Sequence, residues 1–166
     1  MYGSFKYYMK AVAAGIKPII GVETYVTRRS RLDKEAKIDT EPYHLILLAE
    51  NETGYKNLMK LVTISNLEGY YYRPRIDFET LSAHHDGLIC LSACLQGQIP
   101  QLLLRDEVDK AEEVASSYAT LFGPDHYYIE LQRHPAIEQC DPTNEKLVKL
   151  AKKLHLPIVA TNDIHY

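Results

Sequence analysis

The sequence contains no tryptophan, few cysteines and no hydrophobic run long enough to cross a bilayer. Its longest uncharged apolar runs, such as His44–Ala49, are far shorter than the roughly 20 residues that a transmembrane helix needs. The first residues lack the basic and apolar segments of a secretory signal. Three cysteines, Cys90, Cys94 and Cys140, do not suggest a disulfide framework. We therefore expect reduced thiols, no contact with a membrane and a cytoplasmic location.

The sequence also lacks an excess of positive charge and several common motifs of enzymes. Lys and Arg number 19 against 22 Asp and Glu, which gives a formal net charge of -3 at pH 7. No overall positive field attracts nucleic acid, so any contact with DNA must be local or supplied by a partner. The patterns Gly-x-Gly-x-x-Gly, Walker A, Gly-x-Ser-x-Gly and Cys-x-x-Cys do not occur, which argues against a nucleotide-binding fold and a serine hydrolase.

What is present is the composition of an ordinary globular domain, with 46% hydrophobic and 25% charged residues. Segments rich in β-branched and other apolar residues predict five strands, at 17–26, 43–49, 88–92, 127–131 and 156–160. Amphipathic segments between them, such as 55–65 and 108–122, predict helices. This alternation is typical of right-handed βα units, and therefore of a parallel sheet or barrel of the α/β class.

Two ligand-type side chains follow the last predicted strand, and parallel α/β folds gather their sites at the carboxyl ends of strands. Asp163 and His165 share one face of a segment that we expect to be extended, so both can coordinate one cation. Carboxylate plus imidazole suits zinc, manganese or iron. In the alternative interpretation, Asp163 caps a following helix and His165 lies on the surface.

Three further residues are candidates on weaker grounds. Glu23 lies late in an apolar strand, where a buried carboxylate needs a cation or a donor, although an outward-facing Glu is more common. Cys94 follows the third predicted strand and offers a thiolate, although a small buried cysteine is the commoner case. His44 stands at the start of its strand, the wrong end for a simple barrel site, and its pattern is more typical of a structural histidine.

A run of aromatic and basic residues, Tyr70–Arg75, offers rings for stacking on bases and charges for phosphates. An exposed loop whose tyrosines pack by amphipathicity is an equally good interpretation.

Five segments, in this order, carry a resemblance to a known family: 13–26, 43–58, 87–97, 127–132 and 156–166. Together they resemble the PHP (polymerase and histidinol phosphatase) domain of the alpha subunit of bacterial DNA polymerase III. Gly-Tyr-Lys-Asn-Leu at 54–58 and Ala-Thr-Asn-Asp-Ile-His-Tyr at 160–166 are the most specific matches. The resemblance implies a distorted (β/α)7 barrel with a metal cluster at one end. Its ligand positions fall on Glu23, His44, Cys94, Asp163 and His165.

The resemblance also implies what this chain lacks. The family begins with a His-x-His strand and a second strand that ends in Asp-His, and both are expected before Met1. We therefore expect residues 1–166 to be a single partial PHP domain, with about five mostly parallel strands and an incomplete metal cluster. Zinc is the first candidate for its divalent ions, with manganese, iron and magnesium as alternatives. On its own, such a fragment is expected to be inactive.

The function that the resemblance implies is that of a part of a replicative DNA polymerase, whose other domains copy DNA. The PHP domain itself would be a metal-dependent phosphoesterase with 3'-5' exonuclease activity. Its expected partners are DNA, the proofreading exonuclease subunit and other replisome subunits. Two alternatives remain: a stand-alone phosphatase of the histidinol-phosphatase type, and a platform without catalysis that binds the proofreading subunit.

Overall fold

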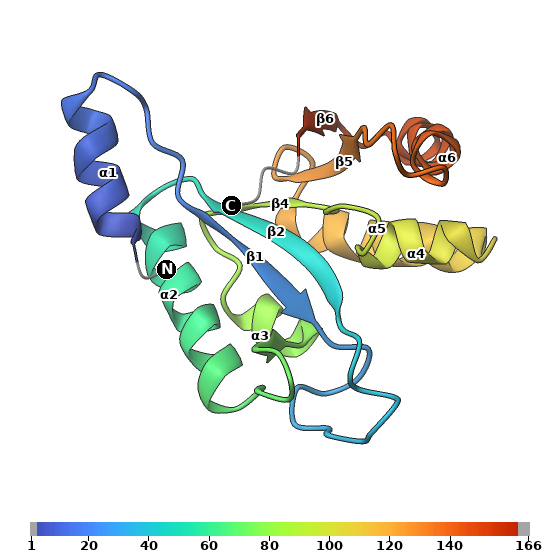
Figure 1. Ribbon diagram of the computed structural model, residues 1–166, viewed down its shortest axis with the longest axis horizontal. Coiled ribbons are helices and arrows are strands. Elements are labelled where there is room, and N and C mark those ends of the chain that lie inside the picture. The colour runs from blue at the N-terminus through green and yellow to red at the C-terminus, as the bar shows by residue number, and fades with distance from the viewer. Residues whose placement is uncertain (1–2, 163–166) are drawn as a thin grey trace.

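A six-stranded sheet with helices forms the structure, a computed structural model that describes residues 3–162 (Figure 1). The strand order is β3-β1-β2-β4-β5-β6. The strands are β1 Gly21–Val26, β2 Tyr43–Ala49, β3 Arg75–Ile76, β4 Leu88–Leu91, β5 Tyr127–Gln132 and β6 Ile158–Thr161. The helices are α1 Ser4–Ala13, α2 Glu52–Leu67, α3 Phe78–Ala83, α4 Gln98–Leu104, α5 Val108–Phe122 and α6 Cys140–Leu154. None of these helices combines the length and the apolar character that a membrane span requires.

Most of the sheet is parallel, as the sequence predicts for an α/β domain, but β2 runs against both of its neighbours. β1 pairs with β3, β4 with β5, and β5 with β6, all in parallel. β2 pairs antiparallel with β1 and with β4. The segment 27–42 between β1 and β2 contains no helix, so the chain returns directly and the two strands pair in opposite directions. All five expected strands form, and the two-residue β3 is an addition that the pattern did not predict.

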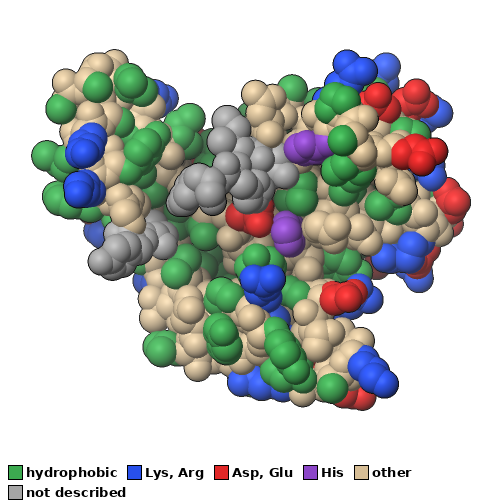
Figure 2. Space-filling view, viewed as in Figure 1, with side chains coloured by type: hydrophobic (Ala, Val, Ile, Leu, Met, Phe, Trp, Pro, Cys, Tyr) green, Lys and Arg blue, Asp and Glu red, His purple; other side chains and the backbone are tan. Residues whose placement is uncertain are grey.

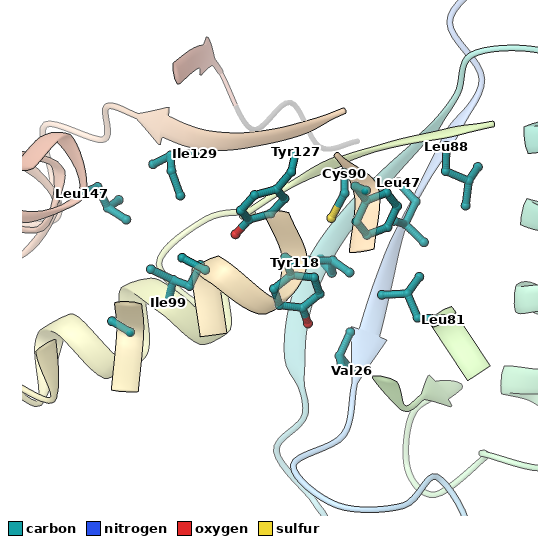
Figure 3. Close-up of a cluster of buried hydrophobic side chains, with 14 of the residues drawn as sticks. Val26, Leu47, Leu81, Leu88, Cys90, Ile99, Tyr118, Tyr127, Ile129 and Leu147 are labelled. Atoms are coloured by element: carbon teal, nitrogen blue, oxygen red, sulfur yellow. The ribbon is translucent and has the colours of Figure 1, made fainter. Parts of the chain in front are cut away.

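The hydrophobic core lies between one face of the sheet and the helices (Figure 3). Alternate strand residues point into it, because successive side chains of a strand face opposite sides. Leu47 from β2, Cys90 from β4 and Tyr127 from β5 are all fully buried. The Tyr127 ring stacks on Tyr118 of α5, with centroids 5.5 Å apart. The helices contribute buried side chains on the other side of this layer, among them Leu58, Leu61, Leu81, Ile99, Ala115, Leu147 and Leu150.

The opposite face of the sheet carries a different set of side chains. Register pairs share a face, and Tyr25 pairs with His44, Glu23 with Ile46, and Ile46 with Leu91. None of these side chains belongs to the core cluster. Strand alternation therefore separates an apolar face under the helices from a face that presents acidic, imidazole and aromatic groups.

The long segment 27–42 is held in place by buried and half-buried charged groups. Arg75, with no exposed surface, donates hydrogen bonds to the backbone carbonyls of Gly69, Asp39, Arg31 and Asp33, at 2.8–3.0 Å. These bonds fasten both the segment and the turn before β3 to one guanidinium. Buried backbone carbonyls need such donors, since an unpaired buried polar group is destabilising.

Asp77 joins the same segment to α3. Its carboxylate accepts hydrogen bonds from the backbone N–H of Thr80, at 2.9 Å, and from that of Arg31, at 2.9 Å. Burial alone would raise the pKa of Asp77, but the bonds from Arg31 and Thr80 outweigh it and lower the pKa to about 2. A carboxyl group whose pKa is lowered by folding stabilises the folded state above its unfolded pKa, and this contribution disappears as the pH falls.

We predict that Asp77→Asn lowers the free energy of unfolding by about 2 kcal/mol at pH 7. This is the free energy that corresponds to the lowering of the Asp77 pKa on folding. The difference between wild type and variant should shrink as the pH falls from about 4 to about 2. Urea denaturation at a series of pH values measures it. Glu79→Gln, on the same helix but with a side chain that is 87% exposed, is the matched control and should have little effect. A difference that stays constant down to pH 2 would contradict the role given to the Asp77 carboxylate.

Candidate metal centre

Pairing of β1 with β2 brings Glu23 and His44 together on the face of the sheet opposite the core. Glu23 pairs with Ile46 and Tyr25 with His44, so Glu23 and His44 are diagonal neighbours across the two strands. Nδ1 of His44 lies 3.2 Å from Oε1 of Glu23, and both side chains are about three-quarters buried. In the space-filling view, acidic and histidine side chains are visible near the middle of the molecule, among apolar groups (Figure 2).

The direction of β2 removes the objection to His44 that its place in the sequence raised. Because β2 is antiparallel to β1 and β4, its first residues lie at the edge where those strands end. His44 therefore sits at the carboxyl-end edge of its neighbours, where parallel folds collect functional groups. The start of β2 is the correct place for a site residue in this sheet.

Cys94 reaches the same histidine from the loop after β4. Ala93 has a positive φ of 64°, uncommon for a residue with a side chain, and turns the chain at this point. The backbone N–H of Gly97 donates to the Cys94 carbonyl at 2.8 Å, and the N–H of His44 donates to the Gln96 carbonyl at 3.1 Å. The loop is thus fastened to the start of β2, and Sγ of Cys94 lies 3.5 Å from Nδ1 of His44.

An aromatic ring fixes the plane of the imidazole. Tyr25 meets His44 edge to face, with ring centroids 5.1 Å apart and planes at 84°. Nδ1 thereby stays directed at Glu23 and Cys94. A neutral imidazole nitrogen, a carboxylate and a thiolate are all ligands of zinc.

Glu130 of β5 is a residue that the sequence interpretation missed. Its side chain is on the same face as Tyr128, which pairs with Leu91, and the residue is only 4% exposed. Oε1 accepts hydrogen bonds from Gln132 and Thr161, while Oε2 is buried and has no hydrogen-bond partner among the described residues. A small pocket is lined by Glu130 together with Cys94. The signal that singled out Glu23, a carboxylate inside an apolar strand, applies equally to Glu130.

The described residues do not form a complete metal site. The contacts of Nδ1 of His44, 3.2 Å to Glu23 and 3.5 Å to Cys94, are those of an ion pair and a hydrogen bond. Within residues 3–162, no three His, Cys, Asp or Glu side chains are arranged as a metal-binding group. Asp163 and His165 lie outside the described residues, so their predicted role as ligands stays a prediction.

Comparison with known proteins identifies the family of this chain. The model of the PHP domain family matches residues 1–134. The chain belongs to the PHP domain family. Among curated proteins it is 49% identical to the DNA polymerase III subunit alpha of Borreliella burgdorferi, 48% to that of Treponema pallidum and 45% to that of Thermus aquaticus. Each match covers all of this chain and 14% of the relative.

The chain thus spans about one seventh of the length of these relatives. The family and the α/β fold that the resemblance implied are confirmed, and the sheet is that of a partial PHP-type barrel. PHP domains are in general metal-dependent, which fits the imidazole, carboxylate and thiol that meet here.

We predict that His44→Ala weakens binding of zinc or manganese at least about tenfold in the full-length protein, since removal even of outer groups around a metal costs that much. Chelator competition and elemental analysis measure the affinity and the bound metal. His126→Ala is the matched control, because His126 also contacts a carboxylate, with Nε2 3.2 Å from Oε2 of Glu50. Equal metal content in wild type and His44→Ala would remove His44 from the site.

Proposed function

We propose that this PHP domain is a metal-dependent phosphoesterase that hydrolyses phosphodiester bonds of DNA from the 3' end. The observation that carries the proposal is the meeting of Glu23 and Cys94 at one nitrogen of His44. These three residues come from β1, the loop after β4 and β2, so only the folded sheet unites them. The three side chains contact one another on a half-buried face, and each is of a type that zinc accepts as a ligand.

Bound divalent ions would supply an activated water and neutralise charge on the phosphate in the transition state. The chain's own residues would hold the ions. Nδ1 of His44 would be one ligand atom, with Tyr25 packed against the ring. Glu23 and Cys94 would add oxygen and sulfur ligand atoms. Asp163 and His165, one residue apart in the sequence, are the proposed further ligands, and the buried Oε2 of Glu130 suits a cation on the same face.

The thiol makes zinc the first candidate, because thiolate favours softer ions. Manganese and iron suit the imidazole and carboxylate groups, and magnesium suits only the oxygen atoms. Carboxylate groups on both sides of the centre therefore allow more than one kind of ion.

The similarity to DNA polymerase III alpha subunits supports placing this domain in a bacterial replicative DNA polymerase. We infer that DNA synthesis belongs to other parts of such a chain, and that the PHP domain trims 3' ends beside it. DNA and replisome subunits, the proofreading exonuclease among them, are the partners that this assignment implies. A cytoplasmic location goes with it.

A platform without catalysis is the second candidate, and α1 favours it. Large hydrophobic side chains of this helix are exposed, Phe5 by 73% and Met9 by 53%. Beside them lies a pocket between α1 and the start of α2, lined by Phe5, Tyr8, Ile20 and Tyr55 among others. Apolar surface of this kind marks an interaction site more often than a catalytic one, and an interaction site can coexist with the metal centre.

We predict that the full-length protein, supplied with zinc or manganese, shortens a 5'-labelled single-stranded oligonucleotide from its 3' end. His44→Ala and Glu23→Gln should lower the rate at least about a hundredfold, equivalent to roughly 3 kcal/mol of lost transition-state stabilisation. Gel electrophoresis of the products measures it, with His126→Ala as the control that keeps the wild-type rate.

Primer extension by the same preparations tests that each variant is folded. Hydrolysis of a small phosphate monoester with no action on DNA would favour a phosphatase of the histidinol-phosphatase type. Absence of any hydrolysis, with metal bound, would refute the phosphoesterase proposal and leave the platform.

A further inference from the structure

Arg73 lies near the candidate metal centre and forms no ion pair with the residues that the structure describes. Its guanidinium carbon lies 5.7 Å from the centroid of the Tyr25 ring, and that ring touches His44. The two contacts together place the guanidinium within about 11 Å of the imidazole. Nearby arginines such as Arg29 and Arg31 pair with carboxylates, but no ion pair joins Arg73 to an Asp or Glu within residues 3–162. The residue is exposed.

Several contacts hold the turn that carries Arg73. The backbone N–H of Tyr71 donates to the Arg73 carbonyl at 3.0 Å. The base of the turn is fixed by Arg75, whose Nε donates to the Gly69 carbonyl at 2.8 Å and whose guanidinium lies over the Tyr71 ring. The face of the Arg73 guanidinium rests on Tyr25, which leaves its edge for a ligand. A cation on an aromatic face is held in place without neutralisation.

Tyr72, at the tip of the turn, presents an aromatic ring to solvent. It is 68% exposed and has a positive φ of 58°, an unfavourable conformation for an aromatic residue. Its ring meets that of Tyr71 edge to face, with centroids 4.7 Å apart. An exposed ring beside an unpaired guanidinium is the combination that binds a single strand of nucleic acid, with bases stacked on the ring and phosphate on the cation.

We propose that the turn formed by residues 69–74 binds single-stranded nucleic acid, with Arg73 on a phosphate and Tyr72 under a base, and so leads the strand to the metal centre. The path of the strand toward the metal centre rests on the proposed function, but the binding of the strand to this turn does not. The chain has a net charge of -3, so no overall positive field attracts DNA. Arg73 would supply positive charge locally. The guanidinium contacts a phosphate a few nucleotides from the bond that is cut.

Arg28 provides a matched comparison on the other side of the sheet. It too is exposed, and its guanidinium lies 5.1 Å from the centroid of a tyrosine ring, that of Tyr43. Tyr43 pairs with Val26, a core residue, and therefore faces the helices and not His44. Arg28→Gln removes the same charge and the same type of ring contact as Arg73→Gln, away from the proposed path of the strand.

The experiment is photocrosslinking of an oligothymidylate that contains one iodouracil, with the full-length protein in chelator so that no hydrolysis occurs. We expect a crosslink in the peptide that contains Tyr72. Its yield should fall about fivefold or more in Arg73→Gln and in Tyr72→Asn, a substitution that tolerates positive φ. It should be unchanged in Arg28→Gln. In a salt titration of the yield, Arg73→Gln should reduce the slope by about 0.7, the value for one phosphate contact on a single strand.

No crosslink at this turn, or equal losses in Arg73→Gln and Arg28→Gln, would overturn the proposal. A second measurement uses metal-loaded protein. Arg73→Gln should raise KM for the oligonucleotide and leave kcat and the hydrolysis of bis(p-nitrophenyl) phosphate unchanged, because that ester has only the phosphate that is cut. If wild type crosslinks at Tyr72 but hydrolyses neither substrate, the phosphoesterase proposal fails and the strand-binding turn stands.

Discussion

The antiparallel pairing of β1 with β2 is the constraint on which the candidate site depends. It places Tyr25 opposite His44 and sets Glu23 on the diagonal, so carboxylate and imidazole share one face. With a parallel β2, His44 would lie at the far edge of the sheet from the ends of β1 and β4. One strand direction therefore decides whether three donor groups meet or remain apart.

That pairing relies on the charged segment 27–42 that joins the two strands. The segment has no helix to give it shape, and Arg75 compensates by donating to carbonyls at several points along it. The same buried guanidinium also fastens the turn that displays Arg73. The buried, structural Arg75 and the exposed Arg73, which is proposed to bind the strand, are thus only two residues apart in the sequence. The same buried side chain therefore stabilises the connection and the turn that presents Arg73.

Apolar pattern alone located the strands, since a buried strand must be β-branched and apolar wherever it pairs. That pattern does not determine the direction of a strand, so a mostly parallel sheet was expected but β2 was not identified as its antiparallel member. Glu23, His44 and Cys94 were weak candidates from the pattern, and a resemblance to a family raised them to ligand positions. Their meeting depends on register and on the turn at Ala93, neither of which spacing encodes. Glu130 was missed because a single acidic residue within a strand was weighed in β1 and not in β5.

The order of the strands in the sheet also determines when, during folding, the three side chains of the candidate site come together. Glu23, His44 and Cys94 are separated by long stretches of chain, and their elements become neighbours only as β1, β2 and β4 pair. Closing such loops carries an entropic cost, and contacts of this sequence separation form slowly. No peptide cut from the chain around one strand keeps more than one of these donors. The contacts among these three side chains are consequently a property of the assembled sheet, and they report on its integrity.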